Sequence, residues 1–169
     1  MTHEEKSRVV IAMTEASPVA EMWRVAMRFL GDSRADLVAL FLADDRWLRV
    51  ASLPFTREFP RVGGRPSEFT RQRAEELHRD AAREARRLID ALAGEARIKT
   101  VFEILSESDR ARLAELVGGA SSILIAPTLI RSRPVYAELI EIGCRIELIE
   151  APKPADADLH RREQGSILP

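Results

Sequence analysis

The fold is decided by residues 121–150, SSILIAPTLIRSRPVYAELIEIGCRIELIE. Ile123–Ala126 is an unbroken apolar run, which is typical of a strand that is covered on both faces. Pro134 stands where a helix would begin, and Gly143 stands where that helix would end. Arg145–Glu150 then alternates charged and apolar residues, as a final strand at a sheet edge does. The stretch therefore predicts a strand–turn–helix–strand unit that closes a parallel α/β sheet.

The remaining segments repeat this pattern of strands and helices. Apolar runs predict strands at Arg8–Met13 and Asp36–Leu42, and charged residues alternating with apolar ones predict a strand at Arg97–Leu105. Helical spacing predicts helices after Ser17, over Ser67–Ala93 and after Ser108. Residues 43–66 break the pattern, and their many apolar side chains predict a flap that folds back on the domain. We expect one domain over residues 1–152, followed by a flexible tail over residues 153–169.

The charge pattern of the strands predicts their order. The first, second and fourth strands are almost wholly apolar and should be central, whereas the third and fifth carry alternating charges and should lie at the edges. This favours a doubly wound five-stranded parallel sheet of order 3-2-1-4-5, with helices on both faces. The order 2-1-3-4-5 would leave an apolar strand at an edge. The expected crevice lies between residues 14–17 and residues 127–133, where the order reverses.

Composition limits the classes of partner. The chain has 169 residues, is 46% hydrophobic and carries a formal charge of −1, which gives no reason to expect a nucleic acid or an anionic membrane as partner. Cys144 is the only cysteine, so no internal disulfide can form. The polar N-terminus has no signal-peptide pattern, and we expect a cytoplasmic location.

Three phrases resemble the universal stress protein family over residues 8–151. SESDRARLAELVGGASSILIAPT (residues 106–128) is similar to the family's third helix and fourth strand, and IGCRIELIEA (residues 142–151) is similar to its closing strand. DLVALFLADDRWLRVASLPFTREF (residues 36–59) resembles members with an extended second loop. The resemblance implies an α/β fold of the adenine nucleotide alpha hydrolase type, homodimers paired through the last strand, and ATP binding in one subgroup.

The residues expected of that ATP-binding subgroup are poorly matched. The subgroup has an acidic residue after the first strand and a Gly-x2-Gly-x9-Gly-Ser/Thr loop after the fourth, whose glycines let backbone N–H groups approach phosphates. Here the acidic position matches Thr14, with Glu15 next to it, and residues 127–133 (PTLIRSR) contain no glycine. Only Ser132 matches the end of the loop motif. The resemblance therefore supports the fold and weakens the assignment of ATP.

Other candidate chemistry is sparse. The histidines are scattered and form no metal-binding pattern: they are His3, His78 and His160. We interpret His78 as a solvated helix residue, Cys144 as a packing residue, and Asp44-Asp45 as turn formers rather than a paired-carboxylate site.

Two surfaces are predicted to bind something. If the crevice holds a ligand, we expect an anion, held by residues that the sequence places around it: Thr14, Glu15, Ser17, Phe41, Pro127, Thr128, Arg131, Ser132 and Arg133. The alternative is that Arg131–Arg133 is only a basic surface turn. We expect the last strand to pair with a second copy of the chain through Arg145, Ile146, Glu147, Leu148 and Ile149. The alternative there is a monomer whose tail covers the strand.

The sequence therefore favours a non-catalytic regulatory or stress-response protein of the universal-stress type. We expect it to need no cofactor, to bind neither nucleic acid nor membrane, and to be a homodimer. The alternative is an ATP- or AMP-binding universal stress protein, or a weak ATPase, with a rebuilt phosphate loop. A third possibility, compatible with the first, is a module that docks a protein partner through the flap at residues 47–59.

Overall fold

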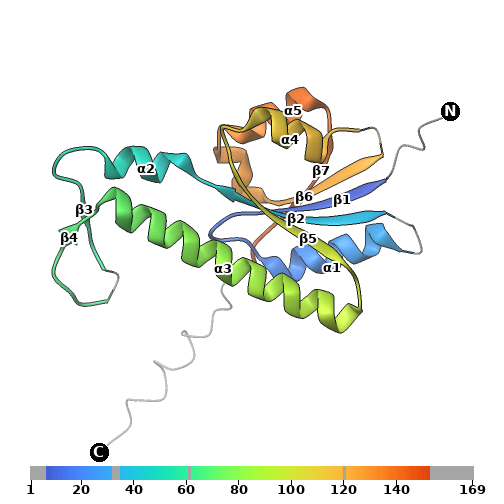
Figure 1. Cartoon of the computed structure of the whole chain (residues 1–169), viewed down its shortest axis with the longest axis horizontal. Coiled ribbons are helices and arrows are strands. Elements are labelled where there is room, and N and C mark those ends of the chain that lie inside the picture. The colour runs from blue at the N-terminus through green and yellow to red at the C-terminus, as the bar shows by residue number, and fades with distance from the viewer. Residues whose placement is uncertain (1–6, 32–34, 61, 120, 153–169) are drawn as a thin grey trace, which may run out of the picture.

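A single parallel sheet organises the chain. The computed structural model describes residues 7–31, 35–60, 62–119 and 121–152. Five strands lie in the order β5-β2-β1-β6-β7 (Figure 1). They are β1 (Arg8–Met13), β2 (Asp36–Ala43), β5 (Thr100–Ser106), β6 (Ser122–Pro127) and β7 (Arg145–Ile149). All four pairings are parallel, so the predicted order 3-2-1-4-5 is confirmed.

Helices cover both faces of the sheet, as Figure 1 shows. One face carries α1 (Val19–Leu30) and α3 (Arg71–Ala96), and the other carries α4 (Arg110–Val117) and α5 (Val135–Ile142). Alternate side chains of β1 pack into the two cores: Ile11 lies in the α1–α3 core, and Val10 lies in the α4–α5 core. Both are fully buried, and each such side chain contributes about 1.5–3 kcal/mol to stability. The central strands are therefore apolar on both sides.

The two edge strands differ from the central ones as predicted. β5 and β7 are only partly buried, and each pairs with a neighbour on one side only within the described sheet. Glu103 on β5 forms an ion pair with Arg112 of α4, 2.6 Å away. Charged side chains at an edge discourage further strand pairing.

Several helix boundaries differ from the predicted ones. α3 begins at Arg71, four residues later than expected, because the Thr70 hydroxyl accepts a hydrogen bond from the Arg73 N–H (3.2 Å). It continues through Gly94 and ends at Ala96, and the capping residue Arg97 adopts the left-handed conformation. Asp109, and not Ser108, caps α4. Polar residues close in sequence compete for each cap, and tertiary contacts decide between them.

The segment predicted as an irregular flap has regular structure. It contains α2 (Asp45–Ala51) and a short strand β3 (Arg57–Glu58), which pairs antiparallel with β4 (Ser67–Glu68). Figure 1 shows it extending beyond the sheet, past the end of β2. The expectation that its apolar side chains are covered is wrong for Leu53 and for Phe55, which is 98% exposed. Both side chains line a hollow in the surface of this segment, together with Phe69 and Thr70.

Two further features complete the fold. Each helix of the described chain is too short or too polar to cross a bilayer. The short 3-10 helix η1 (Thr128–Ser132) joins β6 to α5. The tail expected at residues 153–169 lies outside the described residues.

Candidate functional site at the carboxyl ends of the strands

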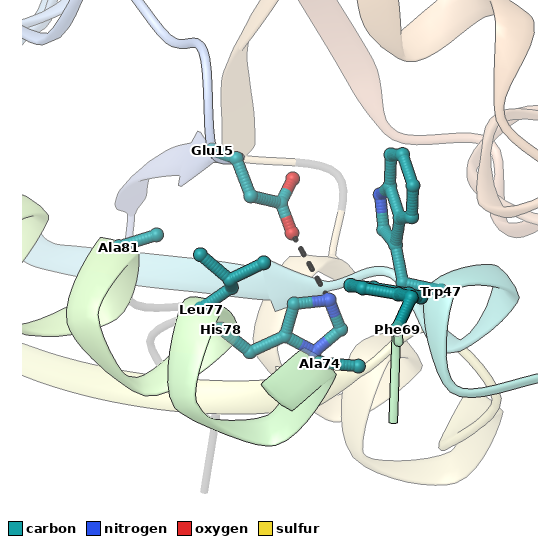
Figure 2. Close-up of a pocket in the computed structure, with 7 residues that line it drawn as sticks. All are labelled: Glu15, Trp47, Phe69, Ala74, Leu77, His78 and Ala81. Atoms are coloured by element: carbon teal, nitrogen blue, oxygen red, sulfur yellow. Dashed lines mark ion pairs between the residues drawn. The ribbon is translucent and has the colours of Figure 1, made fainter. Parts of the chain in front are cut away.

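The strand order reverses between β1 and β6, and the segments that follow these two strands form the candidate site. After β1, the Ser17 hydroxyl accepts a hydrogen bond from the Thr14 N–H (2.7 Å), while the Ser17 N–H donates to the Thr14 carbonyl (3.4 Å). The Ser17 side chain is used in this turn, and α1 begins after Pro18 without a side-chain cap. These bonds hold a tight turn that includes Glu15, and Figure 2 shows the Glu15 side chain extending towards α3.

Arg133 is the central cation of this site. Its side chain is only 6% exposed, although it follows an exposed turn. One Nη donates to the Leu42 carbonyl at the end of β2 (3.1 Å), and the other donates to Glu15 (3.4 Å). The Nε forms an ion pair with Glu107, which follows β5. The guanidinium thus joins the ends of four strands, and its donors face partners within the protein.

Two of the acidic groups near Arg133, Asp44 and Glu107, are themselves buried, whereas Glu15 is more exposed. Burial raises the pKa of Glu107 against the opposing effect of the Arg133 charge. Burial alone would also raise the pKa of Asp44, but hydrogen bonds from Arg46 and the charges of Arg46 and Arg133 lower it overall. Asp44 caps α2 and accepts a bidentate pair of bonds from Arg46 at 2.8–3.0 Å. The crevice therefore contains three carboxyl groups and two guanidinium groups.

The structure separates the other residues predicted to hold an anion. Arg131 and Ser132 are exposed, and the Ser132 hydroxyl donates to the Leu129 carbonyl (2.8 Å). Phe41 is fully buried in the α1–α3 core. Pro127 is buried at the end of β6, and Thr128 begins η1. Of the predicted set, the interactions described above join Thr14 to Ser17 and Glu15 to Arg133.

A pocket of about 300 Å³ lies beside this cluster, between α2, α3 and the turn after β1. Figure 2 shows the side chains that line it: Glu15, Trp47, Phe69, Ala74, Leu77, His78 and Ala81. The Trp47 and Phe69 rings meet edge to face, with their centroids 6.0 Å apart. Most of the lining is apolar, and Glu15 and His78 form its polar end.

The prediction that His78 is a solvated helix residue is wrong. Its side chain is 13% exposed, and its Nε2 lies 3.7 Å from a Glu15 oxygen. The spacing of Ala74, His78 and Ala81 along α3 is helical, so all three lie on one face. That periodicity was the available signal, but the charged residues around His78 obscured it.

The remaining candidate residues have structural roles. Cys144 is partly buried and its thiol donates to the Leu139 carbonyl (3.4 Å). Burial raises the pKa of the Cys144 thiol, which disfavours the reactive thiolate. Among residues 7–31, 35–60, 62–119 and 121–152, no group of three or more His, Cys, Asp or Glu residues could hold a metal ion. His3 and His160 lie outside these residues.

Comparisons with known proteins agree with the fold. No protein-family model and no curated protein matches the sequence. A solved structure of a universal stress protein family member from Burkholderia pseudomallei matches with a TM-score of 0.50 at 16% identity, covering 88% of this chain and 98% of that one. The hypothetical protein MJ0577 matches with a TM-score of 0.53 at 13% identity, covering 88% and 99%. The chain therefore has the fold of a universal stress protein, as the sequence resemblance implied.

Proposed function

We propose that the protein is a non-catalytic regulatory protein of the stress-response kind, and that its crevice does not hold ATP. The fold likeness to a universal stress protein supports the general class. The observation that carries the second part is the position of Arg133, the only buried cation of the predicted anion site. Its donors are directed at Glu107, Glu15 and the Leu42 carbonyl, so a phosphate would have to displace them.

Charge also opposes a triphosphate in this crevice. With the carboxyl groups ionised, Glu15, Asp44 and Glu107 outnumber Arg46 and Arg133, which leaves the cluster with an excess of one negative charge. Bringing like charges together in a partly buried site is unfavourable. The connector after β6 adds no glycine whose backbone could approach a phosphate.

The hydroxyl groups of Thr14 and Ser17 in the described crevice are held by each other, which supports a non-catalytic role. Within the described crevice, the Ser17 hydroxyl bonds to Thr14 instead of to a base. Cys144 precedes β7 and therefore lies at the opposite end of the parallel sheet from the crevice. A regulatory protein of this kind would act through its surfaces, for which β7, an edge strand of the described sheet, and the exposed apolar flap are the candidates.

Calorimetric titration with ATP and with AMP, in the presence of Mg²⁺, tests the proposal. We expect no binding tighter than about 1 mM, equivalent to about −4 kcal/mol. The alternative, a nucleotide binder with a rebuilt loop, predicts micromolar affinity that falls in Arg133→Met and persists in the matched surface variant Arg131→Met. Micromolar binding of either nucleotide to the parent protein would overturn the proposal.

A further inference from the structure

We propose that the pocket between α2, α3 and the turn after β1 binds a small organic ammonium ion with an apolar body about the size of an aromatic ring. The ammonium group would lie between Glu15 and His78, and the body would lie against Trp47 and Phe69. This inference goes beyond the proposed regulatory role and does not depend on whether the crevice holds a nucleotide.

The walls of the pocket suit an apolar body. Phe69 and Ala74 are buried, Leu77 and Ala81 are partly exposed, and Trp47 is 51% exposed beside the pocket. The volume of about 300 Å³ is at the lower end of the range of about 300–1,000 Å³ found for small-molecule sites. Aromatic side chains also attract cations over their faces, and tryptophan does so most strongly.

The polar end of the pocket calls for a ligand that donates hydrogen bonds. The distance of 3.7 Å between the Glu15 oxygen and His78 Nε2 is too long for a direct hydrogen bond. His78 Nε2 is buried and, among the described residues, has no hydrogen-bond partner. Figure 2 shows the carboxylate and the imidazole facing each other. An ammonium group has three donors and no acceptor, so it satisfies both groups when His78 is neutral.

The charge of the pocket favours a cation over an anion. Among the described residues that line the pocket, Glu15 is the only acidic one, and none is a lysine or an arginine. Arg133 neutralises Glu15 only in part, because its Nε is engaged by Glu107 and one of its Nη atoms by Leu42. An alcohol of the same shape has one donor and would satisfy only one of the two acceptors, Glu15 and His78. A carboxylate would be repelled by the like charge of Glu15.

Three probes of matched shape test the inference: 2-phenylethylamine, 2-phenylethanol and 3-phenylpropionate. Each is titrated into the full chain at pH 8 and followed by tryptophan fluorescence and calorimetry. Trp47 lines the pocket and should report occupancy, whereas Trp23 is buried in the core. We expect the amine to bind at least tenfold more tightly than the alcohol, and the carboxylate to show no binding. Equal affinities for the amine and the alcohol, or tighter binding of the carboxylate, would overturn the inference.

Variants locate the binding in the pocket. Glu15→Gln keeps the shape of the side chain. It should weaken the binding of the amine at least tenfold and leave the binding of the alcohol unchanged. Ala81→Leu should fill the pocket and weaken both, which provides a second test if Glu15→Gln unfolds. Glu76→Gln, on α3 but outside the lining of the pocket, is the matched control and should change the binding of neither probe. Amine binding that survives both Glu15→Gln and Ala81→Leu contradicts the inference. No nucleotide is present in this assay, so its failure leaves the ATP result unaffected.

Discussion

Replacing Arg133 with methionine should destabilise the protein more than any surface charge substitution. The change leaves Glu107 without its ion pair, removes the donor to the Leu42 carbonyl and removes the cation beside Glu15. Removing one member of a buried ion pair costs about 3–5 kcal/mol, and an unsatisfied buried carbonyl alone costs about 1–3 kcal/mol. We therefore expect the free energy of unfolding of Arg133→Met to fall by about 3–5 kcal/mol at pH 8.

The loss should depend on pH in one direction. Burial raises the pKa of Glu107 and the charge of Arg133 opposes that rise, so the pKa rises further in the variant. A carboxyl group whose folded pKa exceeds its unfolded pKa binds protons more tightly in the folded state. Such a carboxyl group therefore lowers the free energy of unfolding most at pH values above its folded pKa. This loss disappears as the pH falls to the pKa of the group in the unfolded state. The deficit should be smaller at about pH 4.5 than at pH 8.

Urea unfolding followed by circular dichroism at the two pH values measures the effect. Arg131→Met removes an exposed arginine two residues away and should change the free energy of unfolding by no more than about 0.5 kcal/mol. Adding Glu107→Gln to Arg133→Met should restore part of the loss, because it removes the uncompensated buried charge. A loss below about 1 kcal/mol at pH 8, or a loss that does not change with pH, would refute the reasoning.

Three further predictions concern assembly and stability. The parent should scatter light as a dimer at micromolar concentration, and a folded Ile146→Pro variant should shift towards monomer because proline removes a donor from the β7 edge; a monomeric parent would contradict this. Ile89→Ala empties a fully buried position of the α1–α3 core and should lower the free energy of unfolding by about 2–5 kcal/mol in urea titration. Arg97→Gly should raise it by about 0.5–1 kcal/mol, because Arg97 ends α3 with φ of 56°, and no gain would contradict that account.

The sheet could be predicted from the sequence because the residue types of each strand reflect whether its two faces are buried or exposed. Ile123–Ala126 lies between two helical layers and is apolar throughout, whereas Arg145–Ile149 alternates because Ile146 and Leu148 share the face that packs against the α4–α5 core. The helix boundaries were predicted less well. Both Ser67 and Thr70 are suited to cap α3, but Ser67 is used in the β3–β4 pairing and Thr70 forms the cap. Local propensity cannot rank two such residues without knowing their distant partners.

The candidate site was predicted only in part, because its contacts join residues far apart in the chain. Arg131 and Arg133 are the same residue type in the same short turn, so the sequence does not distinguish them. In the structure Arg131 is exposed to solvent, and Arg133 lies among the carboxyl groups. Glu15 and Arg133 are 118 positions apart, and no local pattern connects them. Glu107 follows the third strand of the sheet, and a lone acidic residue in a turn carries no sequence signal of its burial.

Glu15 links the buried ion cluster to the pocket. Arg133→Met should therefore lower the stability of the protein and raise its affinity for the amine. One of the Glu15 oxygens faces Arg133 and the other faces His78. Arg133→Met removes the cation that partly neutralises Glu15, so a bound ammonium would experience a stronger attraction from it. The variant that loses stability should therefore bind 2-phenylethylamine several-fold more tightly, as measured by calorimetry at pH 8. Weaker binding in the folded variant would show that Glu15 is not the group that recognises the amine, or that Arg133 is needed to position it.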